Sequence, residues 1–429
     1  MRPKHTQHPL PAFPVYSCAF LSQTEMVLGG GGGASRSGIK NKLRLYNVGD
    51  NRSIELKDEY ELERGEDAPM SMAAHRETGI IICGVNSVEE KLLKGENENC
   101  RTFSTNAAKY VHFSFFAIMK EIFIFNHRIK PLTTINTIPV SVQVHLTPSP
   151  HDINGSVESY GVVAGWNPLT LLSFPSLRPI ADTIHVEKDI YDASFSDNNL
   201  VITTTHNLFV YGLPTTTLPK SPTTTSPKKS KKKSKAATNE PNEKLLTLEL
   251  QKSVDVPSST GEGSTFRVGR YHPQNDKVFY TVINVVPPRS RKSKSLSRQA
   301  FICKWNTTTW TLEKSRKVGD GGLTCVDLSP DGRFIGYGFS DLTIGMLDTK
   351  TLSPLASILK AHEFPPTIVK FNLESTLLVS GSPDNSIRIV TIPNDAAGSS
   401  FTTIVMVLLA ILVLLLAVAV RLYPGGISL

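Results

Sequence analysis

The chain has 429 residues, of which 40% are apolar and 20% charged, a composition typical of globular proteins and sufficient for a large core. Its net charge of +8 belongs to two low-complexity runs, since residues 213–247 carry +6 and residues 287–299 carry +5, which leaves −3 on the rest. The folded parts are therefore near neutral, which disfavours an extended nucleic-acid surface, and five cysteines without a CxxC pair argue against a zinc site or a disulfide framework.

The first distinctive segment is "GGGGGASRSGIKNK", residues 29–42, whose glycines suggest a phosphate-binding loop. A Walker loop needs Lys and then Ser or Thr after its last Gly, but Gly38 is followed by Ile39, Lys40 and Asn41. The next residues alternate like a strand, whereas a phosphate loop must open a helix. We therefore interpret the segment as a hairpin connection with an exposed Ile39 at its tip. Loops of this kind often carry binding residues.

Short apolar segments separated by turn residues continue along the chain and predict strands. Examples are "SMAAHRETGIIICGVNS", "YGVVAGWNPLTLLSFPSL" and "YDASFSDNNLVITTTHNLFVYGL". Residues 108–128 fit this pattern badly, and Lys120 and Glu121 disfavour a membrane span there. We interpret them as an insertion, with wrongly included untranslated sequence as one hypothesis for its origin. Its removal would join "CRTFSTNA" to "IKPLTTINT" as an ordinary hairpin.

The basic runs 213–247 and 287–299 are rich in Ser, Thr, Pro and Lys and predict flexible loops, because they offer little apolar surface to bury. We expect the Lys-rich loop to contact anionic lipid or to receive regulatory modification. A role in nuclear localisation or nucleic-acid binding is the alternative for these runs, and we do not expect a nucleic-acid partner.

Two segments near the C-terminus repeat at a fixed offset, with Cys325 and Ile368 lying 43 residues apart at equivalent positions. A period of about 40 to 45 residues with four short strands per unit is typical of a β-propeller blade. Ala361-His362 lies where WD-type blades carry Gly-His, and Asp341 and Asp384 lie in the polar turns.

Upstream, Trp305 takes the tryptophan position that ends a WD-type blade. The length of residues 10–396, after deduction of the two basic loops, accommodates seven or eight blades. The sequence therefore predicts an all-β fold, a seven-bladed WD-type β-propeller.

Residues 401–420, "FTTIVMVLLAILVLLLAVAV", contain no charge and predict a single transmembrane helix, since twenty residues span about 30 Å. The opening residues contain no apolar run of signal-peptide length. We therefore expect a single-pass protein with its propeller in the cytosol and with residues 421–429 as a lumenal tail.

Three features together carry a family resemblance: "PVYSCAF" leading into "GGGGGASRSGIKNKL", the late blade "LSPDGRFIGYGFSDLTIGMLD", and a C-terminal apolar span followed by "LYPGG". With these features the chain resembles the endoplasmic-reticulum membrane exchange factors for the Sar-type GTPase of the COPII coat. That family includes fungal secretion factors and the prolactin regulatory element-binding protein.

The resemblance implies that Gly38, Ile39, Lys40 and Asn41 form a protruding loop that docks on the GTPase. It places Asp67, in "GEDAP", at a similar acidic position nearby. It also implies a potassium ion that orders the loop of residues 29–41, with ligands that the sequence does not assign. Lys40 departs from the family, which often has proline there.

The function implied is guanine-nucleotide exchange: the protein would promote GDP release and GTP loading on a Sar-type GTPase at the endoplasmic-reticulum membrane and so initiate COPII coat assembly. Such a factor performs no covalent chemistry, so the protein is expected not to be an enzyme in that sense. The alternative is a membrane-tethered WD-repeat scaffold without exchange activity.

Overall fold

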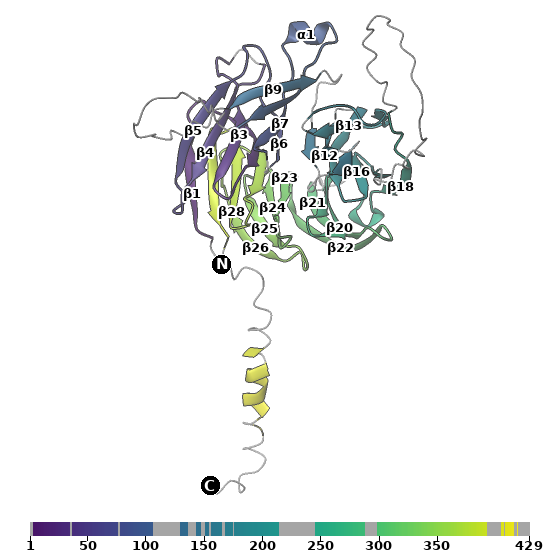
Figure 1. The fold of residues 1–429 in the computed structure, drawn as a ribbon. Helices are drawn as coiled ribbons and strands as arrows, with labels where there is room; N and C mark the ends of the chain where they lie inside the picture. The colour runs from purple at the N-terminus through teal and green to yellow at the C-terminus, as the bar shows by residue number, and fades with distance from the viewer. Residues whose placement is uncertain are drawn as a thin grey trace, which may run out of the picture.

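The computed structural model is built almost entirely of β-strands (Figure 1). It describes residues 3–34, 37–75, 78–105, 129–135, 143–146, 151–153, 156–164, 168–174, 176–213, 245–287, 298–392, 405–406, 408–415 and 418. Among the described residues, two short helices lie between strands, α1 (Glu89–Leu93) and the 3-10 helix η1 (Ser258–Thr260). The predicted all-β propeller class is confirmed.

Within the described residues, six sheets have four strands each. The first two are β2 (Val15–Phe20), β3 (Glu25–Gly30), β4 (Lys42–Val48) and β5 (Ile54–Glu61), then β6 (Ser71–His75), β7 (Ile80–Gly84), β8 (Cys100–Ser104) and β9 (Lys130–Ile135). The next two are β15 (Ile190–Phe195), β16 (Asn199–Thr204), β17 (Asn207–Gly212) and β18 (Leu250–Asp255), then β19 (Ser264–His272), β20 (Asn275–Val285), β21 (Gln299–Asn306) and β22 (Thr311–Asp320). The last two are β23 (Leu323–Leu328), β24 (Phe334–Phe339), β25 (Ile344–Asp348) and β26 (Pro354–Ile358), then β27 (Ile368–Phe371), β28 (Leu377–Ser382), β29 (Ser386–Thr391) and β1 (His5–Pro9).

A further sheet in the described residues departs from this pattern, because it has five strands and β11 pairs off the main path. Its strands are β10 (Gln143–Leu146), β11 (His151–Ile153), β12 (Ser156–Ala164), β13 (Pro168–Phe174) and β14 (Ile184–His185). Six regular blades are therefore present, and the predicted seven are reached only when this irregular sheet is counted as a blade.

The first strands of the sheets form a closed ring around a central axis. In the described residues, β2, β6, β10, β15, β19, β23 and β27 each contact the next strand in this order, and β27 contacts β2. Because each sheet twists, adjacent sheets pack face to face around this ring. Apolar side chains fill the spaces between them, as where Val27 and Leu43 of one sheet pack with Ile81 and Phe103 of the next.

The two ends of the propeller meet in one sheet, since β1 pairs antiparallel with β29 from His5↔Val390 to Pro9↔Ser386. A hairpin of the neighbouring blade supports this pairing. Arg52 Nε donates to Thr6 Oγ1 (3.1 Å), and Arg52 Nη1 donates to Thr391 Oγ1 (3.0 Å). The pairing closes the ring non-covalently.

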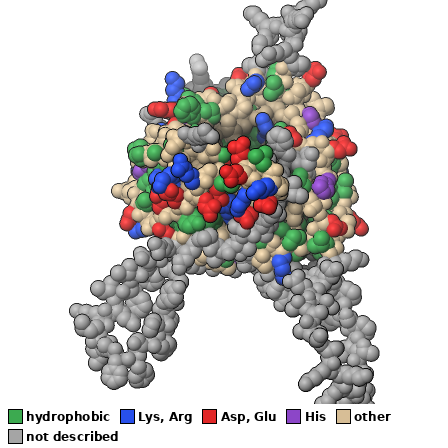
Figure 2. Space-filling view, turned by 90° about the horizontal axis from the view of Figure 1, so that it is seen from above, with side chains coloured by type: hydrophobic (Ala, Val, Ile, Leu, Met, Phe, Trp, Pro, Cys, Tyr) green, Lys and Arg blue, Asp and Glu red, His purple; other side chains and the backbone are tan. Residues whose placement is uncertain are grey.

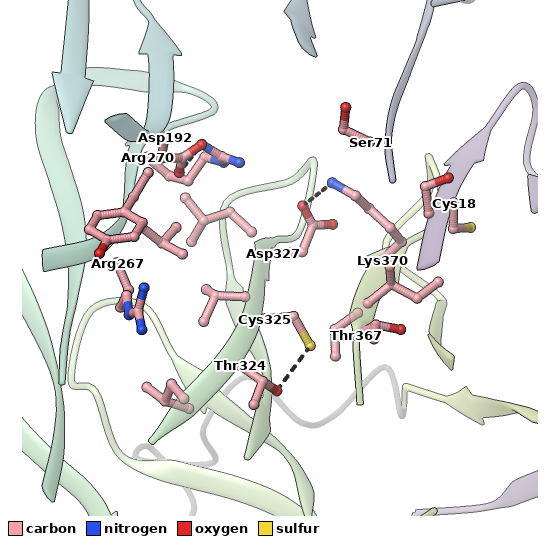
Figure 3. Close-up of a pocket in the computed structure, with 18 of the residues that line it drawn as sticks. Cys18, Ser71, Asp192, Arg267, Arg270, Thr324, Cys325, Asp327, Thr367 and Lys370 are labelled. Atoms are coloured by element: carbon pink, nitrogen blue, oxygen red, sulfur yellow. Dashed lines mark hydrogen bonds and ion pairs between the residues drawn. The ribbon is translucent and has the colours of Figure 1, made fainter. Parts of the chain in front are cut away.

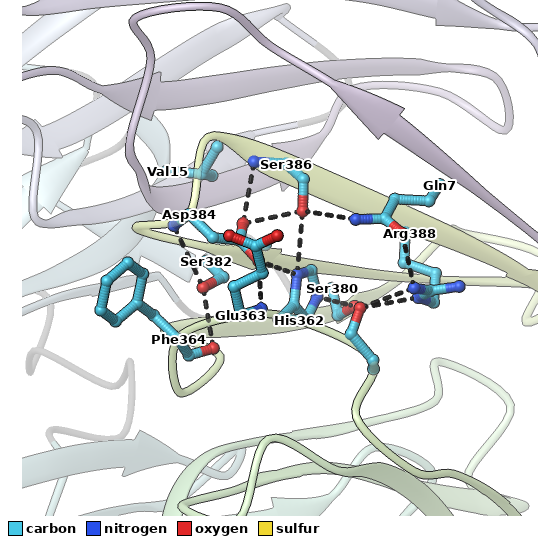
Figure 4. Close-up of polar contacts among 12 residues, drawn as sticks. Gln7, Val15, His362, Glu363, Phe364, Ser380, Ser382, Asp384, Ser386 and Arg388 are labelled. Carbon is cyan, nitrogen blue, oxygen red and sulfur yellow. Dashed lines mark hydrogen bonds and ion pairs between the residues drawn. The ribbon is translucent and has the colours of Figure 1, made fainter.

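A buried polar network organises the closing sheet (Figure 4). The His362 ring lies 2.8 Å through Nε2 from Ser380 Oγ, and 3.2 Å through Nδ1 from Asp384 Oδ2. Asp384 also accepts the backbone N–H groups of Glu363 (2.8 Å) and Ser386 (2.9 Å). The Gly-His-like position and the polar turn identified from the sequence are thus joined, as expected of a WD-type blade.

Other sequence predictions meet the structure in different ways. Trp305 lies buried on β21, and its Nε1 donates to Thr281 Oγ1 (2.9 Å). The segments flanking the predicted insertion pair with each other, since β8 pairs antiparallel with β9. Residues 108–128 themselves lie outside the described residues, as do most of both basic runs and residues 421–429.

The predicted membrane span is described only at positions 405–406, 408–415 and 418, which are helical. Among the residues that the structure describes, no helix combines the length and the apolar character needed to cross a membrane.

The His362 network predicts a pH-dependent stability. Burial lowers the pKa of His362, although Asp384 opposes this shift. Below about pH 6.5, His362 is protonated in the unfolded chain, whereas its protonation is disfavoured in the folded protein. The free energy of unfolding therefore falls as the pH falls. We expect thermal unfolding midpoints to drop between about pH 7.5 and about pH 5.5, and to drop less in His362→Gln. An equal drop in both proteins would contradict this assignment.

Candidate functional site

The glycine-rich segment forms the connection between β3 and β4. The strand ladder ends with the pair Gly30↔Lys42, so residues 31–41 form the loop between the two strands. Gly31, Gly33 and Gly38 have φ of +141°, +70° and +76°, values that side-chain-bearing residues rarely adopt. The loop leads directly into a strand, so it lacks the helix N-terminus that a phosphate loop uses.

Asn41 fixes the loop from within, and the residue is only 7% exposed. Its Oδ1 accepts the backbone N–H of Gly33 (2.8 Å), and its Nδ2 donates to the carbonyls of Gly33 (3.1 Å) and Glu66 (2.6 Å). The backbone carbonyl of Asn41 also accepts the N–H of Leu62 (2.9 Å). One amide therefore joins both ends of the loop to the segment that connects β5 to β6.

The other predicted contact residues differ in exposure. Gly38 and Lys40 are exposed, and Lys40 Nζ lies 2.8 Å from Glu61 Oε1 on β5. Ile39 is partly buried, which corrects the expectation of an exposed side chain at the loop tip. The reason is local, because the loop folds back so that Ile39 packs close to Gly32, where an added Cβ would lie 3.0 Å from the Ile39 side chain.

The β5–β6 connection is itself held by a buried ion pair between two blades. Arg101 Nη2 on β8 lies 2.6 Å from Glu66 Oε1, with side chains only 10% and 5% exposed. Arg101 Nε donates to the carbonyl of Glu98 (2.8 Å), and Glu66 Oε2 accepts the N–H of Glu63 (3.0 Å). The bracing of the glycine loop thus extends from the first blade to the second.

Asp67 lies beside the loop and belongs to the same polar group. Its Oδ1 accepts the N–H of Ala68 (2.8 Å), and its Oδ2 accepts Asn86 Nδ2 (3.2 Å). A Cβ added at Gly33 would lie 3.2 Å from Asp67 Oδ1, so this carboxylate faces the glycine loop. The structure therefore brings Asp67 next to the loop that contains Gly38, Ile39, Lys40 and Asn41.

The connection between β7 and β8 completes this part of the surface and contains α1. Asn97 Nδ2 donates to Asn86 Oδ1 (3.1 Å), and Asn97 Oδ1 accepts the N–H of Ser87 (3.0 Å). At the end of α1, Leu93 is 82% exposed. Figure 2, which views the molecule from above Figure 1, shows acidic and basic side chains lying close together. We call the three connections, residues 31–41, 62–70 and 85–99, the loop face.

Sequence reasoning missed Glu66, Arg101 and Asn86, although they hold the loop face together. Glu66 directly precedes the predicted Asp67, but a single charged residue in a polar turn gives no sign of burial. Arg101 occupies a strand position, where only its pairing with a distant carboxylate explains a buried cation.

No group of three or more His, Cys, Asp or Glu side chains that could hold a metal ion occurs among the described residues. The loop face offers oxygen donors of another kind, the amide of Asn41, the carbonyl of Gly33 and the carboxylate of Asp67. Potassium is bound in proteins by carbonyl oxygens, and each carbonyl retains a second lone pair. The donor chemistry of the loop therefore fits the cation implied by the resemblance.

Comparisons with known proteins agree with the fold. The family "WD domain, G-beta repeat" matches residues 353–390, which include β26 to β28 and most of β29. A segment of 103 residues, 23% of this chain, is 32% identical to "Guanine nucleotide-exchange factor SEC12" of Candida glabrata. Another of 113 residues, 26% of this chain, is 26% identical to human "Echinoderm microtubule-associated protein-like 3".

The matched segments cover only 22% and 12% of the lengths of these two relatives. Together with the structure they support a WD-repeat β-propeller.

The Glu66–Arg101 pair generates a stability prediction. Arg101→Met leaves a buried carboxylate without its cation, and we expect a loss of about 3 kcal/mol in the free energy of unfolding. Glu66→Gln combined with Arg101→Met removes the uncompensated charge, so the double variant should be more stable than Arg101→Met. Urea unfolding measures both.

The matched control is Lys40→Met, which breaks the exposed Lys40–Glu61 pair and should cost less than about 1 kcal/mol. A double variant no more stable than Arg101→Met would show that the buried pair does not brace the connection.

Proposed function

We propose that the protein is a guanine-nucleotide exchange factor that promotes GDP release and GTP loading on a Sar-type small GTPase. The carrying observation is the glycine loop of residues 31–41, which is braced from within by Asn41 and from the second blade by Arg101 through Glu66. The partial similarity to an exchange factor supports the same function.

The loop face suits this task because it offers a small apolar contact on a fixed support. An exchange factor accelerates GDP release only if it binds the nucleotide-free GTPase more tightly than the nucleotide-bound form. A flexible loop would lose part of that binding energy as it became ordered, whereas the Asn41 clamp orders the loop in advance. In this proposal Ile39 provides the apolar contact, with Gly38 and Lys40 beside it.

Asn41 and Asp67 have a different role in this proposal, because both already make hydrogen bonds within the loop face. Asn41 positions the loop, and Asp67 supplies an acidic group at its edge. A potassium ion, when bound, would balance the negative charge of Asp67 and the partial charges of the carbonyl oxygens beside it. Asn41, Gly33 and Asp67 are the residues that would hold it.

We further propose that residues 401–420 attach the propeller to the endoplasmic-reticulum membrane with the propeller in the cytosol. The apolar, uncharged sequence supports this, as do the exposed side chains of Leu408, Leu412 and Leu414. Confinement to one membrane would restrict GTPase activation, and hence COPII assembly, to that surface.

Fluorescence-monitored GDP release from a Sar-type GTPase tests the exchange function with the full chain as catalyst. We expect Ile39→Ala to lower the exchange rate about tenfold or more, because truncating a central apolar contact typically costs about 2 kcal/mol of binding. The thermal unfolding midpoint should change little, since Ile39 is not fully buried.

Leu359→Ala is the matched control, since it also removes an apolar side chain, one that is 75% exposed outside the loop face. It should leave exchange unchanged. Running the assay in potassium and then in sodium salts tests the cation separately. No acceleration by folded wild-type protein would instead favour the membrane-tethered scaffold.

Membrane attachment is tested by fractionation of cells that express either the full chain or a version ending at residue 400. The full chain should stay in the membrane pellet after alkaline extraction, because an apolar helix of this length partitions into lipid. The shortened version should be released. Release of both proteins would rule out residues 401–420 as the anchor.

A further inference from the structure

A polar cavity of about 1180 Å³ lies at the centre of the ring, lined by the inner strands (Figure 3). It does not belong to the loop-face function proposed above, although Met70 lies both on the loop face and on the cavity lining. Cavities of this volume exceed the usual range of about 300–1,000 Å³ for small-ligand sites, so a compact ligand would fit inside.

The charged groups lining this cavity are predominantly cationic. Among the described lining residues the cations are Arg267, Arg270, Arg298 and Lys370, and the acids are Asp192 and Asp327. In Figure 3 Arg267 and Arg270 lie on one side and Lys370 lies on the other. Positive charge is therefore distributed around the wall rather than on one flat patch.

Both acids are occupied by contacts that join neighbouring blades. Asp192 Oδ2 accepts the N–H of Gly269 (3.0 Å) and pairs with Arg270. Asp327 Oδ2 accepts the N–H of Phe371 (3.0 Å), and its Oδ1 lies 2.9 Å from Lys370 Nζ. Each acid thus neutralises one cation, which leaves the charges of Arg267 and Arg298 in excess.

Arg267 and Arg298 are both exposed, and neither has a carboxylate within ion-pair distance in the described part of the chain. The Arg267 guanidinium lies over the Tyr191 ring, 4.5 Å from its centroid. Stacking holds the guanidinium plane while leaving its N–H groups free to donate. Arg267 is therefore a partly ordered cation without an acidic partner.

We propose that this central cavity binds a small ligand with several phosphate groups. An arginine guanidinium can donate two parallel N–H groups to one phosphate. A phosphate is therefore a better partner for Arg267 and Arg298 than a simple counterion is. Arg267 on β19 and Arg298 directly before β21 belong to one blade, and the paired Lys370 lies across the cavity, so a compact ligand inside it would meet several cations.

Calorimetric titration of the full chain with inositol hexakisphosphate tests the site without any GTPase, so its outcome is independent of the exchange function. We expect saturable binding that Arg267→Gln and Arg298→Gln each weaken about tenfold or more, as loss of a charge-assisted contact requires. Lys314→Gln, which removes one exposed charge from the outer strand β22, is the matched control and should bind as the wild type does.

Two comparisons separate the cavity from nonspecific attraction. Poly-glutamate should bind much more weakly than the phosphate probe. Replacing Arg289, Arg291, Lys292 and Lys294 of the basic run by Gln should preserve most of the binding, because the proposed site rests on Arg267 and Arg298.

The source of the phosphates is distinguished by phosphatidylcholine vesicles that contain phosphatidylinositol bisphosphate. Arg267-dependent capture on vesicles would support the proposal with a lipid headgroup as ligand, and binding of the free probe alone would support it with a soluble ligand. Failure of the folded wild type to bind either probe would overturn the proposal. Equal weakening by Lys314→Gln and Arg267→Gln, or equal binding of poly-glutamate, would also overturn it.

Discussion

The pairing of β1 with β29 is the constraint on which the propeller depends, because it joins the two ends of the ordered ring. In an open arc of sheets, the first and last blades would expose apolar faces to water. In the closed ring, Phe13 and Met26 on one side and Val379 and Ile389 on the other are completely buried in one cluster. Closure must bring together strands almost 400 residues apart, and such non-local pairing is slow and cooperative. The closed ring holds the sheets in fixed positions, and the loops between their strands can differ in sequence without changing this arrangement.

The loop face uses this rigid support in a specific way. The glycines allow residues 31–41 a backbone conformation that other residue types rarely adopt. The hydrogen bonds of the Asn41 side-chain amide hold the loop in that conformation. Glu66 and Arg101 extend the restraint into the neighbouring blade. The exchange function that we propose needs a loop that is ordered before binding. Binding energy used to order the loop would no longer contribute to the difference in affinity between the two GTPase states.

Much of the fold could be predicted because the strands alternate and the late blades repeat with clear turns, as Cys325 and Ile368 show. The irregular β10–β14 sheet could not, since its five strands and off-path β11 break the repeat. The glycine loop stood out by its composition, and the resemblance suggested an acidic position beside it at Asp67. The partial burial of Ile39 could not be predicted, because its packing against Gly32 depends on how the loop folds back. Glu66 and Arg101 were missed for a similar reason, since their pairing joins two blades.

The pairing of β8 with β9 has an evolutionary consequence. Ser104 and Lys130 face each other across this ladder, so the chain leaves the blade and returns to it at almost the same point. The entropy of closing such a loop grows only slowly, by about 0.6 kcal/mol for each doubling of its length. A change in the length of the connection between these two residues would therefore cost the blade little, and the same propeller could form around a longer or a shorter connection.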